Sequence, residues 1–360
     1  MTKLFPVFFV LLLISSVASA GNDPLGERLE RALAPQIGPG KTAGAVVGVW
    51  KDGQAHFFSF GETVRGSGKK PAQDTLFAIA SITKTFTSLI LADAVTRGET
   101  TLDSQLSTMI PELSGQLTAS ITLKQLATHS SGLARLPCNM KVDDEDQPYA
   151  SYTESDMLAG LRDGALKGPN CEVLPHPHTP SIYSNWGMAT LGYALGRAKN
   201  ATYGQVLKSV VTDPLGLRDT TIAPTDEQEH RRSKSYAEDG HELLPWKRQA
   251  MLGNGAIFST ADDLFAYLRA QLDPATTPLA AAITLTHKTQ HQDSDGIHGL
   301  AWYKLGTEDD APILHNGSAA GYRSYILANP KNKIGFFWLA NSSRDLNCVA
   351  EAIAGKDCAR

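Results

Sequence analysis

Residues 77–86 read Phe77-Ala78-Ile79-Ala80-Ser81-Ile82-Thr83-Lys84-Thr85-Phe86 and place a serine and a lysine one helical turn apart. The pattern predicts a long amphipathic helix over Ser81 to Thr96, closed by Gly98. Positions i and i+3 share a helix face, so Ser81 and Lys84 would meet. A neutral lysine amine can take a serine proton, and N–H groups at a helix start favour a developing oxyanion. The segment therefore predicts a nucleophilic serine with its own base.

The same Ser-x-x-Lys spacing occurs a second time, in Ser67-Gly68-Lys69-Lys70. That copy lies in the Gly- and Lys-rich residues 66–71, which predict an exposed loop. An alternative for Ser81 is that its hydroxyl only caps the helix. Because only the Ser81 copy begins an amphipathic helix, we select Ser81 as the candidate nucleophile.

Strand patterns lie near both ends of the chain, and helical patterns lie between them. The expected strands are Gly44–Trp50, Gln54–Phe60, Pro312–His315, Tyr322–Ala328 and Ile334–Ala340. The other expected helices are Asp23–Ala34, Thr122–Thr128, Thr153–Arg162, Asn185–Ala198, Tyr203–Thr212, Thr260–Leu272 and Leu346–Ala354. This order predicts an α/β plus all-α fold, in which one antiparallel sheet is built from both chain ends, helices pack on it, and a helical region is inserted.

The expected domain organisation follows from the same pattern. Residues 21–80 and 271–360 would form the α/β sheet domain, and residues 81–270 would form the mainly helical region. The seam between two such regions is a common place for a cleft, so we expect the active site there.

Composition and the N-terminus narrow the class of protein. The chain has 33 Lys plus Arg against 37 Asp plus Glu, a net charge of −4, so it offers no broad basic surface for a nucleic acid. Residues 1–20 read as a signal peptide, with Lys3, an apolar run over Leu4–Ile14 and the small residues Ala18-Ser19-Ala20. We therefore expect a periplasmic or secreted protein that has no membrane insertion after signal cleavage.

The four cysteines are Cys138, Cys171, Cys348 and Cys358. In an oxidising compartment an even number suggests two disulfides, and three connectivities are possible. We favour Cys138 with Cys171 and Cys348 with Cys358, since each pair closes a local loop.

Two further motifs carry chemistry. Tyr183-Ser184-Asn185 precedes a predicted helix; a phenol can relay protons near a lysine, and Asn185 can donate to a substrate carbonyl. The alternative interpretation of this motif is that Tyr183 only packs in the core and Asn185 only caps the helix. His315-Asn316-Gly317 ends a predicted strand, where glycine lets a substrate lie close to the strand edge. Its alternative is a strand that simply runs into a turn.

In this order, the three motifs resemble the serine β-lactamase and penicillin-binding-protein superfamily, particularly its class C branch. The resemblance spans nearly the whole mature chain and also includes Leu123–Leu133, Asp213–Leu217, Gly253–Asp263 and Gly321–Asn341. It implies that Ser81 is acylated, Lys84 activates it, Tyr183 passes the proton to the leaving group, and Asn185 orients the substrate amide. It further implies an oxyanion hole of the Ser81 and Ser318 backbone N–H groups, and a water that hydrolyses the acyl-enzyme with help from Tyr183 and Lys84.

The departure from that pattern is His315. Family members that act on β-lactams or D-alanyl peptides usually have a lysine there, which attracts the substrate carboxylate; histidine resembles the esterase, D-aminopeptidase and amidase members. A histidine gains charge as the pH falls toward 6, so we expect carboxylate-bearing substrates to bind better there. Asn316 and Gly317 would line the same substrate edge. Arg323 would either hold a substrate carboxylate or have only a surface role.

The function predicted from these residues is that of an exported serine hydrolase acting on a β-lactam or a D-alanyl-type peptide amide. The alternatives are an esterase or amidase of the same fold, and a slow-turnover penicillin-binding or sensor protein. The substrate would be a small molecule or derive from peptidoglycan, no cofactor is needed, and we expect a monomer. His176, His178, His287 and His291 lack a further ligand at a metalloenzyme spacing, so no metal site is predicted.

Overall fold

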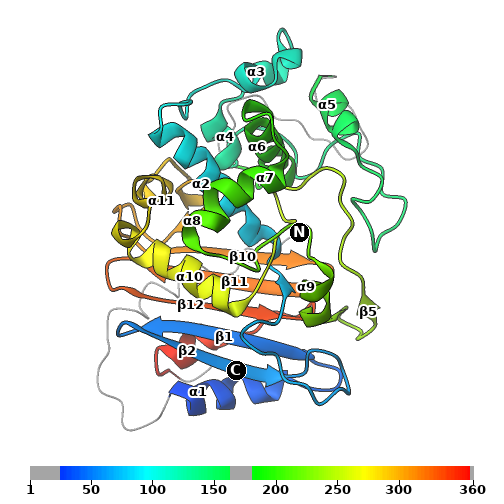
Figure 1. Cartoon of the computed structure of the whole chain (residues 1–360), viewed down its shortest axis with the longest axis vertical. Coiled ribbons are helices and arrows are strands. Elements are labelled where there is room, and N and C mark those ends of the chain that lie inside the picture. Colours follow the sequence, from blue (N-terminus) through cyan, green and yellow to red (C-terminus); the bar gives the residue numbers. More distant parts are fainter. Residues whose placement is uncertain (1–24, 163–180, 357–360) are drawn as a thin grey trace.

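The computed structural model describes residues 25–162 and 181–356. Its centre is an eight-stranded antiparallel sheet in the order β2-β1-β12-β11-β10-β9-β8-β7 (Figure 1). The strands are β1 (Gly44–Lys51), β2 (Gln54–Gly61), β7 (His291–Asp293), β8 (Gly296–His298), β9 (Tyr303–Lys304), β10 (Ile313–Ala319), β11 (Tyr322–Asn329) and β12 (Ile334–Ala340). Because β1 pairs with β12 over six residues, the two ends of the chain share one sheet, and the predicted fold class is confirmed.

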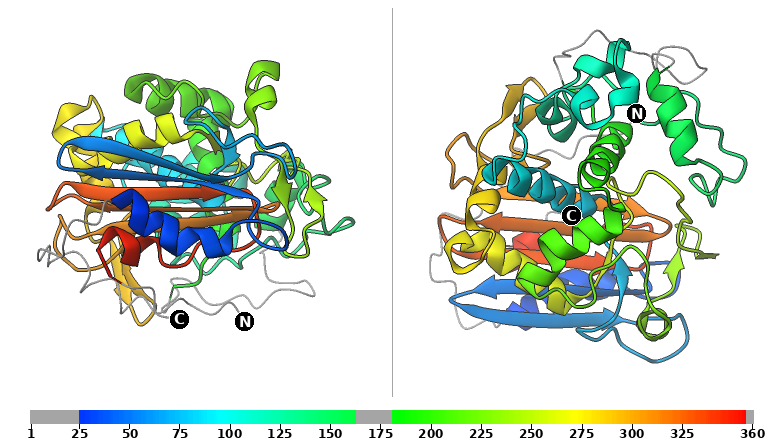
Figure 2. Two further views of the ribbon diagram at one scale, coloured as in Figure 1. Left: turned by 90° about the horizontal axis from the view of Figure 1, so that it is seen from below. Right: turned by 45° about the horizontal axis from the view of Figure 1, so that its top comes forward.

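Helices cover both faces of this sheet. The inserted helices lie on one face, whereas α1 and α12 lie together on the other (Figures 1 and 2). The helices are α1 (Leu25–Leu33), α2 (Thr83–Thr96), α3 (Leu106–Met109), α4 (Leu123–Ala127), α5 (Glu154–Arg162), α6 (Asn185–Ala198), α7 (Tyr203–Leu207), α8 (Asp213–Leu215), α9 (Asp226–Arg231), α10 (Ala261–Leu272), α11 (Ala280–His287) and α12 (Val349–Ile353). Two short pairs complete the structure: β3 (Phe77–Ala78) with β6 (Phe258–Ser259), and β4 (Ser235–Tyr236) with β5 (Glu242–Leu243).

Local sequence explains several of these elements. The β1–β2 turn uses Asp52 and Gly53 at φ of 54° and 75°, and such a left-handed pair is typical of two-residue hairpins. The side chain of Thr122 accepts a hydrogen bond from the Gln125 backbone, and Gln125 in turn caps the Thr122 N–H, which fixes the start of α4. In β10, successive residues are alternately buried and more accessible, as expected of a strand whose side chains point to opposite faces of the sheet.

Each face of the sheet carries its own core. Val46, Ile313, Ile326 and Phe337 belong to the large core beneath the inserted helices. The opposite side of the same strands packs against α1 and α12 in a smaller core. The domain boundaries at residues 80 and 270 stay predictions.

The elements between α10 and β10 differ from expectation. The structure adds α11 and the strands β7, β8 and β9, which the sequence pattern did not indicate. His287 therefore ends a helix while His291 begins a strand, so these two histidines do not share a helix face. The expected helix Tyr203–Thr212 is divided into α7 and a π-helical turn over Lys208–Thr212.

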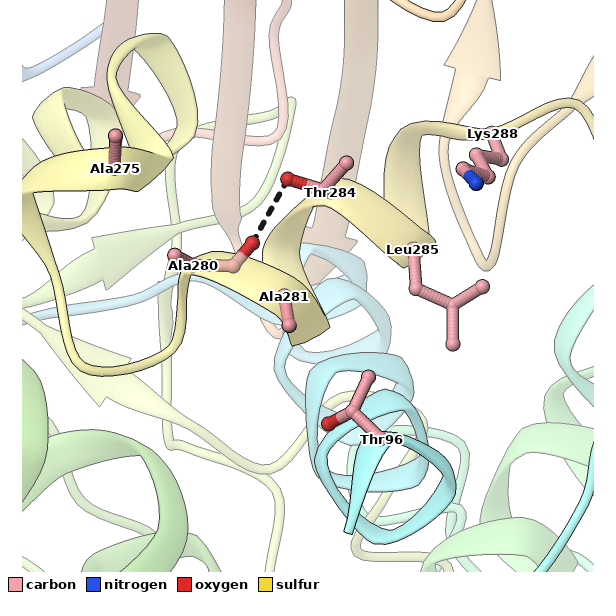
Figure 3. Close-up of a pocket in the computed structure, with 7 residues that line it drawn as sticks. All are labelled: Thr96, Ala275, Ala280, Ala281, Thr284, Leu285 and Lys288. Atoms are coloured by element: carbon pink, nitrogen blue, oxygen red, sulfur yellow. Dashed lines mark hydrogen bonds between the residues drawn. The ribbon is translucent and has the colours of Figure 1, made fainter. Parts of the chain in front are cut away.

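A hollow of about 510 Å³ lies between the C-terminal end of α2 and α11 (Figure 3). Small and apolar side chains dominate its lining, and the Thr284 hydroxyl there donates to the carbonyl of Ala280. Thr96 and Lys84 are twelve residues apart on one helix, about 18 Å at 1.5 Å per residue. This hollow is therefore remote from Ser81.

Candidate active site

Ser81 lies in a single 3₁₀ turn, Ala80–Ile82, immediately before α2. Ala80 adopts a φ of 47°, which L residues rarely adopt, and the sharp bend places Ser81 at the helix start beside β10. The Nζ atom of Lys84 lies 2.9 Å from Ser81 Oγ and donates to the Asn254 carbonyl at 2.6 Å. By contrast, Ser67 and Lys70 are exposed in a loop. The two Ser-x-x-Lys copies thus have different surroundings.

The environment of Lys84 favours its neutral form. The side chain is fully buried, and burial lowers its pKa well below the ordinary value. The positive charges of Arg248 and then Arg135 lower the pKa further. A neutral amine 2.9 Å from a hydroxyl can accept its proton, so this pair can generate a nucleophile.

Tyr183 lies beside this pair. Lys84 Nζ is 4.8 Å from the centroid of the phenol ring, and burial raises the Tyr183 pKa to about 12 although the Ser81 hydroxyl opposes that shift. Tyr183 is therefore protonated at neutral pH and can donate. Asn185 begins α6 two residues later, and its Oδ1 is buried with no hydrogen-bond partner in the described residues.

His129 holds Tyr183 in place, a role that the sequence analysis did not assign. Its carbonyl accepts from Ile182 N at 2.9 Å and its Nδ1 accepts from Ser184 N at 3.2 Å, so it binds the backbone on both sides of Tyr183. The two rings are 4.4 Å apart between centroids. Because Nδ1 accepts, the ring hydrogen sits on Nε2. The one available signal was its position inside Leu123–Leu133, a segment of the resemblance.

β10 forms the opposite side of the site. A Cβ on Gly317 would lie 2.9 Å from Ser81 N and 2.5 Å from the Ile79 carbonyl, so only glycine lets the strand approach this closely. Ser324 on β11 donates to the same Ile79 carbonyl at 2.8 Å. β9 pairs with β10 only at Ile313 and Leu314, which leaves residues 315–319 without a strand partner on that side among the residues described. This free edge suits an extended substrate.

His315 is present at the site but does not have the expected charge behaviour. Its ring lies 6.4 Å from that of Tyr183 and is fully buried. Burial is the main cause that lowers its pKa to about 3, and a protonated Lys84 would also disfavour a second positive charge there. His315 therefore stays neutral between pH 5.5 and 8.5, and the expected gain in carboxylate binding toward pH 6 is wrong. Its Nδ1 donates to the Asn316 carbonyl at 2.7 Å, which leaves Nε2 as an unused acceptor.

Arg323 is not brought into this group. Asn316 and Ser318 are exposed, while His315 and Gly317, which alternate with them along β10, are buried. Arg323 pairs across the sheet with Ser318 and so shares its face. There its Nε donates to the Ser343 carbonyl at 2.9 Å and lies 3.7 Å from Asp345 Oδ1.

Two other arginines reach the site from distant loops. The Cζ atom of Arg135 lies 5.2 Å from the Tyr183 ring centroid. Arg248 stacks over Tyr149 at 4.0 Å and donates through Nη1 to Asn254 Oδ1 at 3.1 Å. Arg248 thus supports the residue whose carbonyl holds Lys84. Both arginines lie outside the motifs named in the sequence analysis, so no signal in the sequence pointed to them.

The remaining predictions concern metals, membranes and cysteines. Within residues 25–162 and 181–356 no cluster of three metal-ligating side chains is present, and no helix is long and apolar enough to cross a membrane. His176, His178, Cys171, Cys358 and the signal segment 1–20 lie outside the described residues. In the described part no cysteine is a free thiol, but the predicted pairing itself is not tested.

Comparisons with known proteins agree with this geometry. The family model described as Beta-lactamase matches residues 29–355. The D-alanyl-D-alanine-carboxypeptidase/endopeptidase AmpH of Escherichia coli K12 is 28% identical over 327 residues, covering 85% of this chain and 81% of that protein. A Beta-lactamase of the same strain is 24% identical over 94% of this chain and 95% of its own length. A class C beta-lactamase structure superposes with a TM-score of 0.81 at 20% identity, over 93% of this chain and 97% of that one.

Proposed function

This chain belongs to the beta-lactamase family, and from that premise we propose that it is an exported serine hydrolase that forms an acyl-enzyme on Ser81. The observation that carries the proposal is the 2.9 Å separation of Lys84 Nζ and Ser81 Oγ, at a lysine whose pKa is lowered by burial. A serine without a base so close would be a poor nucleophile.

The proposed reaction has two halves. Ser81 Oγ attacks the substrate carbonyl while its proton passes to Lys84 Nζ, and the tetrahedral oxyanion is held by the backbone N–H groups of Ser81 and Ser318. As the C–N bond breaks, the protonated Tyr183 phenol donates to the leaving nitrogen and regains a proton from Lys84. Asn185 orients the substrate amide. Water then attacks the ester, losing a proton to the Tyr183 and Lys84 pair, and Ser81 leaves as the alcohol.

For the substrate we propose a β-lactam or a D-alanyl-type peptide amide, with Asn316 and Gly317 along its edge. The relatives named above as carboxypeptidase/endopeptidase and as beta-lactamase support this class. A neutral His315 favours a second candidate, an esterase or amidase of the same fold, because it supplies no charge for a carboxylate. A protein that keeps its acyl group and turns over slowly is the third.

We further propose export to the periplasm or beyond, a monomer, and disulfides between Cys138 and Cys171 and between Cys348 and Cys358. The signal-like residues 1–20 support export, and the lack of a free thiol in the described part supports the disulfides. Peptide mapping under non-reducing conditions tests the pairing.

Incubation with a fluorescent penicillin, followed by intact-mass measurement over time, tests the proposed function. A transient adduct is expected of a β-lactamase and a lasting one of a penicillin-binding protein. No adduct, together with hydrolysis of p-nitrophenyl esters, identifies the esterase. Ser81→Ala should abolish both adduct and hydrolysis, while Ser67→Ala in the exposed loop should change neither. Full hydrolysis by purified Ser81→Ala protein would refute the acyl-enzyme.

A further inference from the structure

Among the residues that the structure describes, the charges acting on Lys84 are positive. Two guanidinium groups, those of Arg248 and Arg135, act on Lys84, and no carboxylate of the described residues is among the causes of the pKa shift of Lys84 or of Tyr183. A site with uncompensated positive charge attracts an anionic ligand.

Of these basic side chains, only Arg135 is available to a ligand. Lys84 is buried and held neutral. Arg248 is committed, because its Nη1 donates to Asn254 Oδ1 and to the Met251 carbonyl at 2.9 Å. Arg135 is exposed, and among the described residues its guanidinium has neither an ion pair nor a hydrogen bond. Its contact there is with the Tyr183 ring, 5.2 Å from Cζ.

His315 and Arg323, the two residues that the sequence suggested for binding a substrate carboxylate, cannot supply a positive charge at this site. His315 stays neutral near neutral pH, because its pKa is lowered to about 3. Arg323 lies on the other face of the sheet, bonded to the Ser343 carbonyl. Arg135 faces the phenol that serves the leaving group, and a guanidinium presents several donors that match a carboxylate.

We propose that Arg135 is the carboxylate-binding residue of this site, so that the substrate is an acyl compound with a carboxylate within reach of the Tyr183 ring. The inference rests on the proposed function and sharpens it by naming the substrate's charge. Arg135 comes from the loop after α4, and its backbone carbonyl also accepts from Asn185 N at 3.0 Å. The carboxylate site and the start of α6 are therefore coupled through one residue.

The test uses two p-nitrophenyl esters that differ in charge, the neutral butyrate and the hydrogen succinate, with parent, Arg135→Gln and Arg135→Lys proteins. The parent should prefer the succinate. Arg135→Gln should reduce that preference, expressed as a ratio of kcat/KM values, by about tenfold or more through KM, as expected for a lost charge-assisted hydrogen bond. Arg135→Lys should recover part of it, and the parent's preference should weaken with added NaCl because the guanidinium is exposed.

Lys331→Gln is the matched control. It removes one positive charge from the turn between β11 and β12, past Asn329, which itself lies five residues and so roughly 17 Å along β11 from Ser324. It should keep the parent's preference. An unchanged preference in Arg135→Gln would overturn the inference while leaving Ser81 catalysis in place. Equal hydrolysis of both esters by Ser81→Ala protein would instead overturn the proposed function, and this inference with it.

Discussion

Two buried lysines, Lys84 beside Ser81 and Lys304 on β9, begin from similar local chemistry. Each is at most 4% exposed, and the pKa of each is lowered by burial. Each donates to backbone carbonyls, Lys84 to that of Asn254 and Lys304 to those of His287 and Glu308. Each also has a buried histidine nearby, His129 or His287, whose pKa is lowered first by burial and then by the charge that the lysine carries when protonated.

The charges that surround Lys84 and Lys304 have opposite signs. The guanidinium groups of Arg248 and Arg135 lower the pKa of Lys84 further, whereas Asp309, Glu308 and Asp310 counteract the burial of Lys304. The partners differ too: Lys84 has the Ser81 hydroxyl, which can give up a proton, while the carbonyls around Lys304 only accept. Burial alone therefore does not make a lysine a base. The neighbouring charges and a proton donor decide it.

The largest expected effect comes from removing each amine in turn. Lys84→Met should lower kcat/KM by about 10³-fold, because a general base supplies about 10² to 10⁴ of the rate. Lys304→Met should lower the free energy of unfolding by about 1 to 3 kcal/mol by leaving buried carbonyls unpaired, with kcat/KM within threefold of the parent. Ester kinetics and urea unfolding measure both. If the two variants lose activity alike, the contrast between the regions is false.

The two histidines beside these lysines should also differ, His129 affecting kcat and His287 affecting stability. His129→Ala should lower kcat roughly 10- to 100-fold, because Tyr183 loses its support, with a smaller change in KM. His129→Asn should recover part of the rate, since asparagine tolerates the φ of 61° found there and can accept from Ser184 N. His287→Ala, which removes the bond to Gln271, should affect stability and spare kcat. Equal kcat values for His129→Ala and His287→Ala would show that His129 has no positioning role.

The smallest expected effect is a shift in the pH profile. The acid limb of kcat/KM for a neutral ester reflects protonation of Lys84, and Arg248 lowers that pKa. Arg248→Gln removes a positive neighbour, so the Lys84 pKa rises and the acid limb moves to higher pH. Lys331→Gln, a remote loss of the same charge, should leave the limb in place. If the acid limb of kcat/KM stays at the same pH in Arg248→Gln, then Arg248 does not lower the Lys84 pKa.

Local patterns predicted most of the fold because they report burial and turns directly. The apolar runs and the Asp52-Gly53 turn located β1 and β2, and the helix α6 begins and ends as predicted. The strands β7 to β9 were missed because they are short and rich in polar residues. Helix α11 was missed because its apolar and polar residues do not separate onto two faces, so it lacks an amphipathic pattern: Thr286 and His287 are buried whereas Ala281 is exposed.

The residues of the site also fall into those that local sequence predicted and those that only the fold brings together. Ser81, Lys84 and Tyr183 lie in motifs whose chemistry can be read along the chain. Arg135 and Arg248 act only because the fold brings two loops together, 113 positions apart in the sequence. The neutral state of His315 likewise depends on complete burial, which a residue type does not reveal.

The central claim is that Lys84 is a neutral amine at the pH of catalysis. Nitrogen-15 and carbon-13 NMR of lysine-labelled protein tests it directly, with Lys84→Met and Lys304→Met identifying the two buried resonances. The Lys84 Nζ resonance should already be that of a neutral amine at pH 7.5 and should titrate at a lower pH than that of Lys304. A Lys84 resonance that remains that of an ammonium ion up to pH 9 would contradict the account.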